Sequence, residues 1–188
     1  MQEHEHYCGD IENYPPDKFL QFGIGKGTKV LIVGESPAPN GWRKSGKAFY
    51  TIEGKILPTG RNLNKLLEEY GLSVERCGFT ELVKCYVGKD RHLLSSCGKK
   101  CWEIFTKQLK AHEFSFLIIL GVKTLELFNK CAKLGLKIGK IVDAKIDGDA
   151  YTILPIYHPS PVSPTGHKNN IKIFERNRKV LKSLFLQD

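Results

Sequence analysis

Two segments of the sequence combine reactive side chains with a backbone rich in glycine and proline. The first, at 34–38, reads Gly-Glu-Ser-Pro-Ala and follows the β-branched apolar run at 28–33. The second, at 158–161, reads His-Pro-Ser-Pro and follows the apolar run at 151–157. A carboxylate can orient water, and a histidine can donate a hydrogen bond to developing negative charge. Loops that follow the strands of an α/β sheet can build one pocket, so the pattern predicts a site at the strand ends.

Apolar periodicity indicates that strands and helices alternate along the chain. Short apolar runs predict strands at 28–33, 79–86, 114–120 and 151–157. Apolar residues spaced by three and four predict helices at 63–70, 95–109, 122–134 and 170–186. Ser95 or Ser96 is expected to cap the second of these helices. Such alternation favours a three-layer α/β/α sandwich with a central, mainly parallel four-stranded sheet, and we expect residues 1–188 to form one domain.

The composition is that of a globular protein with a basic surface. Hydrophobic residues make up 41% and charged residues 26%, which excludes a disordered chain. Lys and Arg outnumber Asp and Glu by 29 to 20, a net charge of +9, which favours a polyanionic partner such as nucleic acid. No apolar stretch approaches the roughly 18 residues of a membrane span, so we expect a soluble intracellular protein without a membrane partner. The segment 1–10 is expected to be mobile or metal-binding.

One glycine-rich segment has the residue types of a phosphate loop in the wrong context. It reads Gly-Ile-Gly-Lys-Gly-Thr at 23–28. A phosphate loop follows a strand and opens a helix, whereas this segment precedes the predicted strand and lacks the full glycine spacing. A basic turn is therefore the better interpretation.

The two reactive segments resemble the two signature motifs of the uracil-DNA glycosylase superfamily. They read LIVGESPAPNGWRKSGKAF from Leu31 and YHPSPVSPTG from Tyr157, in the family's order. The first is most similar to the iron-sulfur-containing bacterial and archaeal families numbered four and five, and LVKC at 82–85 is similar to their Asn-x-x-Lys-Cys segment. The resemblance covers nearly the whole chain. It implies a uracil-DNA glycosylase-like fold and a hydrolase of base excision repair, which flips a deaminated base out of damaged DNA and hydrolyses the N-glycosidic bond.

The resemblance also implies roles for individual residues. His158 would hydrogen-bond the pyrimidine O2 and stabilise negative charge as the glycosidic bond breaks. Phe49 would stack on the extruded base, while Gly34, Glu35 and Ser36 would frame its polar edge and the attacking water. The DNA-binding residues would follow His158, with Val162 as the wedge that enters the vacated stack: Ser160, Pro161, Val162, Ser163, Gly166 and Lys168.

The chain departs from the family where a carboxylate usually orients water. Ser36 stands where the best-known uracil glycosylases have Asp, and Ile52 aligns with the Asp of family five. Glu35 and Glu53 are the remaining carboxylates that could orient water or stabilise an oxocarbenium-like sugar, although either could be a solvated charge. This departure motivates an alternative, in which the same scaffold binds damaged or single-stranded nucleic acid without cleaving it.

A second departure concerns the choice of base. Glu81 stands where the family has the Asn that reads the base. An amide both donates and accepts hydrogen bonds, whereas an ionised carboxylate only accepts. Uracil presents an N3 donor beside an O4 acceptor, so ionised Glu81 would satisfy one and repel the other, while protonated Glu81 could read both. We therefore hypothesise removal of uracil or a related base with altered or broadened specificity.

The cysteine pattern matches the family's metal site in part. Cys85 and Cys101 have fifteen residues between them and resemble the last two cluster ligands, but the usual amino-terminal Cys-x-x-Cys is absent. Cys8 and Cys97, the latter one helical turn before Cys101, could complete a four-thiolate site for a 4Fe–4S cluster.

Other interpretations of the cysteines stay open. Zinc is the alternative metal, with His4 or His6 replacing a thiolate, and a metal-free protein is a third possibility. A metal-dependent redox or sensor domain is a weaker hypothesis. The hydrolysis itself needs no soluble cofactor. The resemblance implies a monomer that acts on damaged DNA in a prokaryotic cytoplasm, associated with the nucleoid.

Overall fold

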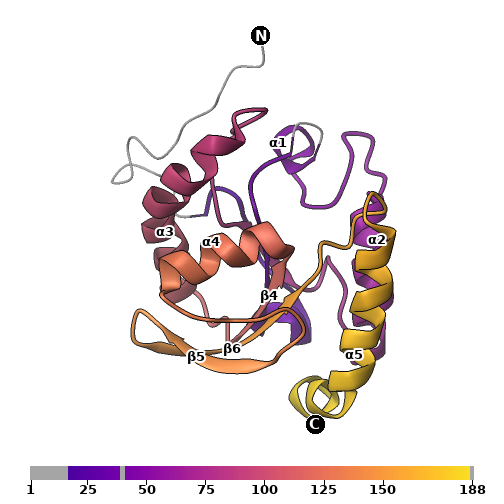
Figure 1. The fold of residues 1–188 in the computed structure, drawn as a ribbon. Helices are drawn as coiled ribbons and strands as arrows, with labels where there is room; N and C mark the ends of the chain where they lie inside the picture. The colour runs from indigo at the N-terminus through magenta and orange to yellow at the C-terminus, as the bar shows by residue number, and fades with distance from the viewer. Residues whose placement is uncertain (1–16, 39–40, 187–188) are drawn as a thin grey trace.

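The computed structural model describes residues 17–38 and 41–186, which form a sheet covered by helices on both faces (Figure 1). Within these residues the sheet has six strands in the order β1-β3-β2-β4-β6-β5. The four central strands are mutually parallel: β3 (Gly78–Glu81), β2 (Val30–Gly34), β4 (Phe116–Leu120) and β6 (Asp149–Ile156). Two antiparallel edge strands flank them: β1 (Leu20–Gln21) and β5 (Val142–Ile146). The predicted α/β sandwich with a parallel four-stranded centre is confirmed, and the full sheet is larger and mixed.

The central strands are buried on both faces, as parallel strands between helical layers must be. Every residue of β2 and β4 is buried. Alternate side chains of β2 enter two different cores, because successive strand residues point to opposite faces. Leu31 and Val33 belong to one core, and Val30 and Ile32 to the other.

Two pairs of helices supply the outer layers. Helices α3 (Leu94–Ala111) and α4 (Val122–Ala132) pack together over one core, while α2 (Pro58–Leu67) and α5 (Pro164–Phe185) run side by side over the other (Figure 1). The short elements are α1 (Trp42–Ser45), η1 (Gly25–Lys29), η2 (Glu68–Tyr70) and η3 (Arg91–Leu93). No helix within the described residues is long and apolar enough to cross a lipid bilayer.

Several predicted boundaries differ from the structure. Neither Ser95 nor Ser96 caps α3, because η3 runs directly into the helix and moves its start to Leu94. Ser96 instead donates its hydroxyl to the carbonyl of Leu93 at 3.0 Å. Helix α5 begins at Pro164 rather than at 170. Proline is well suited to this position, because the amide of a first helical residue has no partner within the helix and proline has no amide hydrogen. The strand predicted at 79–86 ends at Glu81.

The two edge strands were not expected from the sequence. Strand β1 has only two residues, too few for a periodic pattern. Strand β5 is polar at alternate positions and joins β6 through a tight turn at Asp147 and Gly148, with φ angles of 51° and 97°. An Asp-Gly pair between alternating strands is a hairpin signal that sequence reasoning could have used.

Candidate active site

A cavity of ≈ 760 Å³ opens at the carboxyl ends of the parallel strands. The loops after β2, β3, β4 and β6 all contribute to its wall. Such an edge is where α/β folds usually bind ligands. The lining includes residues predicted from both motifs and from the middle segment: Gly34, Glu35, Ser36, Phe49, Glu81 and His158.

Gly34 and Glu81 lie side by side at the end of the β2–β3 pairing. They are partners in the parallel register, and the amide of Leu82 donates to the carbonyl of Gly34 at 2.9 Å. A Cβ atom at position 34 would overlap Oε2 of Glu81 and lie 3.0 Å from Cζ of Phe79. The glycine therefore lets the Glu81 carboxyl lie against the backbone at the cavity wall.

The Glu81 side chain is held in a neutral form by its surroundings. The residue is only 8% exposed, and loss of hydration raises the pKa of its carboxyl to about 8. The positive charge of Lys84 opposes this rise, and the negative charge of Glu35 adds to it. At neutral pH the protonated acid can donate one hydrogen bond and accept another, as an amide does.

Lys84 lies fully buried behind Glu81 in a cage of oxygen atoms. Its Nζ donates to Thr80 Oγ1 at 2.5 Å, to the carbonyl of Glu81 at 2.5 Å and to Gln108 Oε1 at 2.7 Å. Burial lowers its pKa to about 7, against the charges of Cys101 and Glu81, which raise it. These three bonds fix the backbone of Glu81 and thereby the direction of its carboxyl. The sequence analysis noted Lys84 only as part of the LVKC segment and did not predict that it would hold Glu81 in place.

His158 presents one defined ring nitrogen to the cavity. It follows β6, and the backbone amide of Ser160 donates to its Nδ1 at 3.3 Å. In the neutral ring the proton must then be on Nε2, which is free to donate to a ligand. His158 keeps an exposed surface while lining the cavity, and desolvation by the surrounding protein lowers its pKa below 6.5, although Glu35 acts in the opposite direction. A neutral donor at pH 7 follows.

Two asparagines that sequence reasoning missed hold the loop carrying His158. Buried Asn170 on α5 accepts from the amide of Tyr157 at 2.9 Å and donates to its carbonyl at 2.8 Å. Asn62 on α2 donates to the carbonyl of Pro159 at 2.8 Å. Asn62 lies 97 positions from Pro159 and Asn170 lies 13 positions from Tyr157, so neither contact belongs to the local pattern of one helix or strand. The signal in the sequence was a polar Asn170 close to the apolar residues of a predicted helix, Ile171 and Phe174.

Replacing Asn170 by Ala should lower the free energy of unfolding by about 2 kcal/mol and also displace the His158 loop, because both backbone groups of Tyr157 lose their partner. Asn129 offers a matched control, since it binds the amide and carbonyl of Leu136 in the same way outside the cavity lining. Urea unfolding and activity of the folded proteins provide the measurements. Equal loss of activity in Asn170→Ala and Asn129→Ala would contradict a positioning role for Asn170.

Phe49 is held against the cavity wall in a restricted conformation. Its φ of 64° is unusual for a bulky residue and commonly marks a functional position. The ring packs edge-on against Phe79, with centroids 4.6 Å apart, and a Cβ at Gly60 would lie 2.9 Å from Cβ of Phe49. The ring is therefore fixed on one side and can offer an aromatic surface to a planar ligand on the other.

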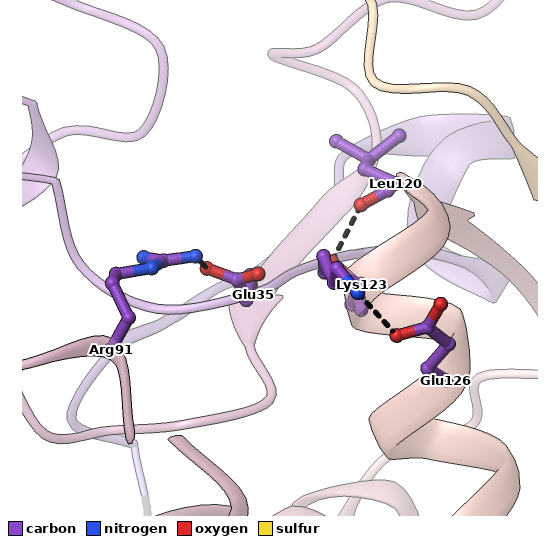
Figure 2. Close-up of polar contacts among 6 residues, drawn as sticks. Glu35, Arg91, Leu120, Lys123 and Glu126 are labelled. Atoms are coloured by element: carbon purple, nitrogen blue, oxygen red, sulfur yellow. Dashed lines mark hydrogen bonds and ion pairs between the residues drawn. The ribbon is translucent and has the colours of Figure 1, made fainter. Parts of the chain in front are cut away.

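Glu35 is engaged in an ion pair at the cavity wall. Its carboxylate binds the guanidinium of Arg91, the first residue of η3 (Figure 2). The side chains are 19% and 55% exposed. Ser36 lies in the cavity, whereas Glu53 is exposed and absent from its lining, and hydrogen bonding to Thr51 lowers the pKa of Glu53. The structure thus brings Glu35, but not Glu53, to the other predicted site residues.

The segment predicted to contact DNA forms an exposed turn. Val162 is 90% exposed, and its amide donates to Ser160 Oγ at 3.2 Å, which stiffens the turn. Pro161 and Ser163 are exposed as well. Gly166 and Lys168 belong to the start of α5, the first buried and the second exposed. An apolar tip on a hydrogen-bonded turn beside His158 has the geometry that a wedge requires.

The described cysteines do not by themselves make a metal site. Cys85, Cys97 and Cys101 are buried in the core under α3, and the amide of Lys84 donates to Cys101 Sγ at 3.3 Å. No group of three or more His, Cys, Asp or Glu side chains in the part of the chain described here could hold a metal ion. Cys8, the fourth predicted ligand, lies outside the described residues, as do His4 and His6. The described thiols alone therefore do not fit a four-thiolate cluster.

Fold and cavity together define an α/β architecture in which a cavity lies at the carboxyl ends of the four parallel strands, where α/β folds usually bind ligands. The family model described as the Uracil DNA glycosylase superfamily matches residues 22–182, which include β2, helices α1 to α4, most of α5 and the cavity lining. The chain belongs to this superfamily, whose members are generally hydrolytic DNA glycosylases.

Proposed function

We propose that the protein is a DNA N-glycosylase that flips a deaminated base into the ≈ 760 Å³ cavity and hydrolyses its N-glycosidic bond. The observation that carries the proposal is the convergence of His158, Phe49 and Glu81 from three separate chain segments on that cavity. A hydrogen-bond donor can stabilise charge on the leaving base, an aromatic ring can stack on it, and a neutral acid can both donate to and accept from its polar edge. Membership of the superfamily and the net charge of +9 support DNA as the substrate.

In this proposal the residues divide the work between base and sugar. Phe49 stacks on the base, and neutral Glu81 accepts from N3 and donates to O4. As the bond between C1′ and N1 breaks, its electron pair passes to the base, and His158 Nε2–H stabilises the charge on O2. Water then forms the new bond to C1′, and the proton that it loses passes through solvent to the released base anion, which becomes the neutral base. The Glu35 carboxylate, held by Arg91, stabilises the positive sugar electrostatically, and Ser36 helps to position the water.

The neutral form of Glu81 supports uracil as the preferred base near pH 7. Ionised Glu81 suits bases with adjacent donors, so the range of bases is expected to broaden at higher pH. Ser160, Val162 and Lys168 are proposed to grip the DNA backbone and to fill the vacated stack. We further propose that the protein acts as a monomer on nucleoid DNA in a prokaryotic cytoplasm.

Release of base from end-labelled oligonucleotides tests the function. Each strand carries one uracil, hypoxanthine or xanthine, and alkali converts abasic sites into strand breaks. We expect breaks at the uracil position and none in the matched undamaged strand. Intact strands after prolonged incubation with saturating protein would contradict the glycosylase proposal.

One observation favours a second candidate, a damage-binding protein without turnover. Among the described residues that line the cavity, the carboxylates are Glu35 and Glu81, the first ion-paired and the second largely protonated at neutral pH. Neither group is therefore well suited to accept a proton from the attacking water. Saturable binding to uracil-containing strands that stay intact would select this candidate.

We also propose a 4Fe–4S cluster on Cys8, Cys85, Cys97 and Cys101, as the resemblance to families four and five implies, with no role in the bond-breaking step. Because Cys85, Cys97 and Cys101 do not form a metal-holding group in the described structure, this proposal requires their thiols to move together when the cluster binds. Anaerobically purified protein is expected to contain iron and sulfide and to absorb near about 400 nm. Cys101→Ser should lose both, whereas Cys131→Ser, a change outside the proposed ligand set, should keep them. A colourless, metal-free and fully active protein would exclude the cluster, and zinc in place of iron would assign the thiolates to zinc.

A further inference from the structure

A second cavity of ≈ 490 Å³ lies beside the first, between the start of α3 and the first turns of α4. We call it the α3/α4 groove. It shares Glu35, Arg91 and Lys123 with the lining of the base cavity, so the two spaces are contiguous.

Close packing of the two helices gives the groove an apolar part. A Cβ at Gly98 would lie 2.6 Å from Cδ2 of Leu127, so glycine is what allows α4 to approach α3 this closely. Leu94 and Leu127 line the groove from the two helices. An apolar surface of this kind can accept the carbon atoms of a sugar, which a purely charged surface cannot do well.

Three basic side chains of the groove are each oriented by a partner within it. Arg91 binds Glu35, and Lys123 Nζ lies 2.9 Å from Glu126 Oε2; Figure 2 shows the two pairs around the first turns of α4. Lys130 Nζ donates to Ser95 Oγ at 3.1 Å. Three cations face two carboxylates, and His92 adds another donor. The exposed pair of Lys123 and Glu126 adds little stability, so an incoming phosphate can compete for Lys123. Arg91 can donate its remaining N–H groups to a phosphate while it keeps its contact with Glu35.

We propose that the α3/α4 groove is a phosphodiester-binding subsite for the nucleotide next to the extruded one. The inference rests on the proposed function, because it assumes that a nucleotide occupies the base cavity. A base inside that cavity leaves its flanking phosphates at the shared wall, where Arg91 and Lys123 stand. The strand then continues over Leu94 and Leu127 toward Lys130. The site takes one sugar-phosphate backbone, and cations rather than base-reading groups dominate it, so its binding is independent of sequence.

Lys130→Ala tests the subsite, with Lys145→Ala as a matched control. Lys130 is exposed and outside the base cavity, while Lys145 is an exposed lysine on β5 at the far edge of the sheet. The probe is a fluorescent single-stranded oligonucleotide carrying a tetrahydrofuran abasic analogue, which cannot be hydrolysed. Anisotropy titrations in KCl should show weaker binding by Lys130→Ala and a salt slope shallower by about 0.7, the change expected when one phosphate of a single strand is no longer neutralised.

Each outcome separates the subsite from the glycosylase proposal. Lys145→Ala, which lies outside both cavities, should match wild type in affinity and in salt slope. Equal salt slopes for all three proteins would overturn the subsite, even if wild type releases uracil. A shallower slope for Lys130→Ala alone would support the subsite, even if no base is released. Failure of wild type to bind the probe would overturn both, and competition by an acidic peptide but not by DNA would reassign the groove.

Discussion

Replacing His158 by Ala is expected to slow base release about 10²- to 10³-fold while DNA binding is retained. The reason is that Nε2–H is aimed at charge that develops only as the glycosidic bond breaks, so its loss weakens the transition state more than the bound substrate. The amide of Ser160 that holds Nδ1 leaves Nε2 as the donor. Single-turnover release of uracil at saturating protein measures the chemical step directly.

His112→Ala provides the control for this prediction. His112 packs against Phe22 and Phe114 and is absent from the cavity lining, so its removal should leave the rate of the folded protein unchanged. His158→Gln, which keeps a donor of similar reach, should recover part of the lost rate. If His158→Ala releases uracil as fast as wild type, His158 does not stabilise the leaving base.

Release of uracil by the wild-type protein should fall as the pH rises through about 8, the value to which burial raises the pKa of Glu81. Below that pH the neutral acid satisfies both N3 and O4 of uracil, whereas above it a carboxylate faces the O4 acceptor. Loss of one essential proton lowers kcat/KM by about tenfold per pH unit. A pH profile of kcat/KM between about pH 6 and pH 10 measures this decline.

The variant Glu81→Gln tests whether Glu81, rather than a neighbouring titratable group, causes the alkaline decline of kcat/KM. Glutamine donates and accepts at every pH, so the alkaline decline should disappear in this variant. Lys84 behind the carboxyl and His158 in the same cavity are still present, so an effect of either group on the rate would remain in the profile of Glu81→Gln. Superimposable alkaline limbs in wild type and Glu81→Gln would exclude Glu81 as the titrating group.

The same pKa shift predicts how Glu81 affects stability. Its folded pKa of about 8 lies above the ordinary 4.5, so the unfolded chain releases this proton at lower pH than the folded one. The stabilising contribution of Glu81 is therefore complete below about pH 4.5 and is lost as the pH rises through about 8. Urea midpoints for Glu81→Gln should change less across this window than those of wild type.

The parts of the fold that follow local rules could be predicted from the sequence. The apolar run at 114–120 predicted strand β4, and the helix predicted at 63–70 ends where the structure has Gly71, with a φ of 68°. The residue types at strand ends also indicated which side chains would share a site. Their meeting at one cavity follows from parallel strands having their carboxyl ends at one edge.

The remaining features depend on contacts between distant segments. The support of the His158 loop by Asn62 and Asn170 joins two helices to one strand end. The pairing of Glu35 with Arg91 spans 56 positions, and nothing near either residue specifies it. The protonation of Glu81 depends on how completely its neighbours exclude water, which only the packed structure determines.

The close fit between Gly34 and Glu81 limits the order in which this chain can change. A Cβ at position 34 would overlap Oε2 of Glu81 and lie 3.0 Å from Cζ of Phe79, so the Glu81 carboxyl would have to leave its place. A shorter residue at position 81 would remove the closest of these contacts, and an alanine at position 34 would then cost less. Routes that begin at position 34 pass through an intermediate with a displaced Glu81 carboxyl, whereas routes that begin at position 81 do not. A substitution at position 81, which changes the base preference, is thus expected to come before a substitution of Gly34.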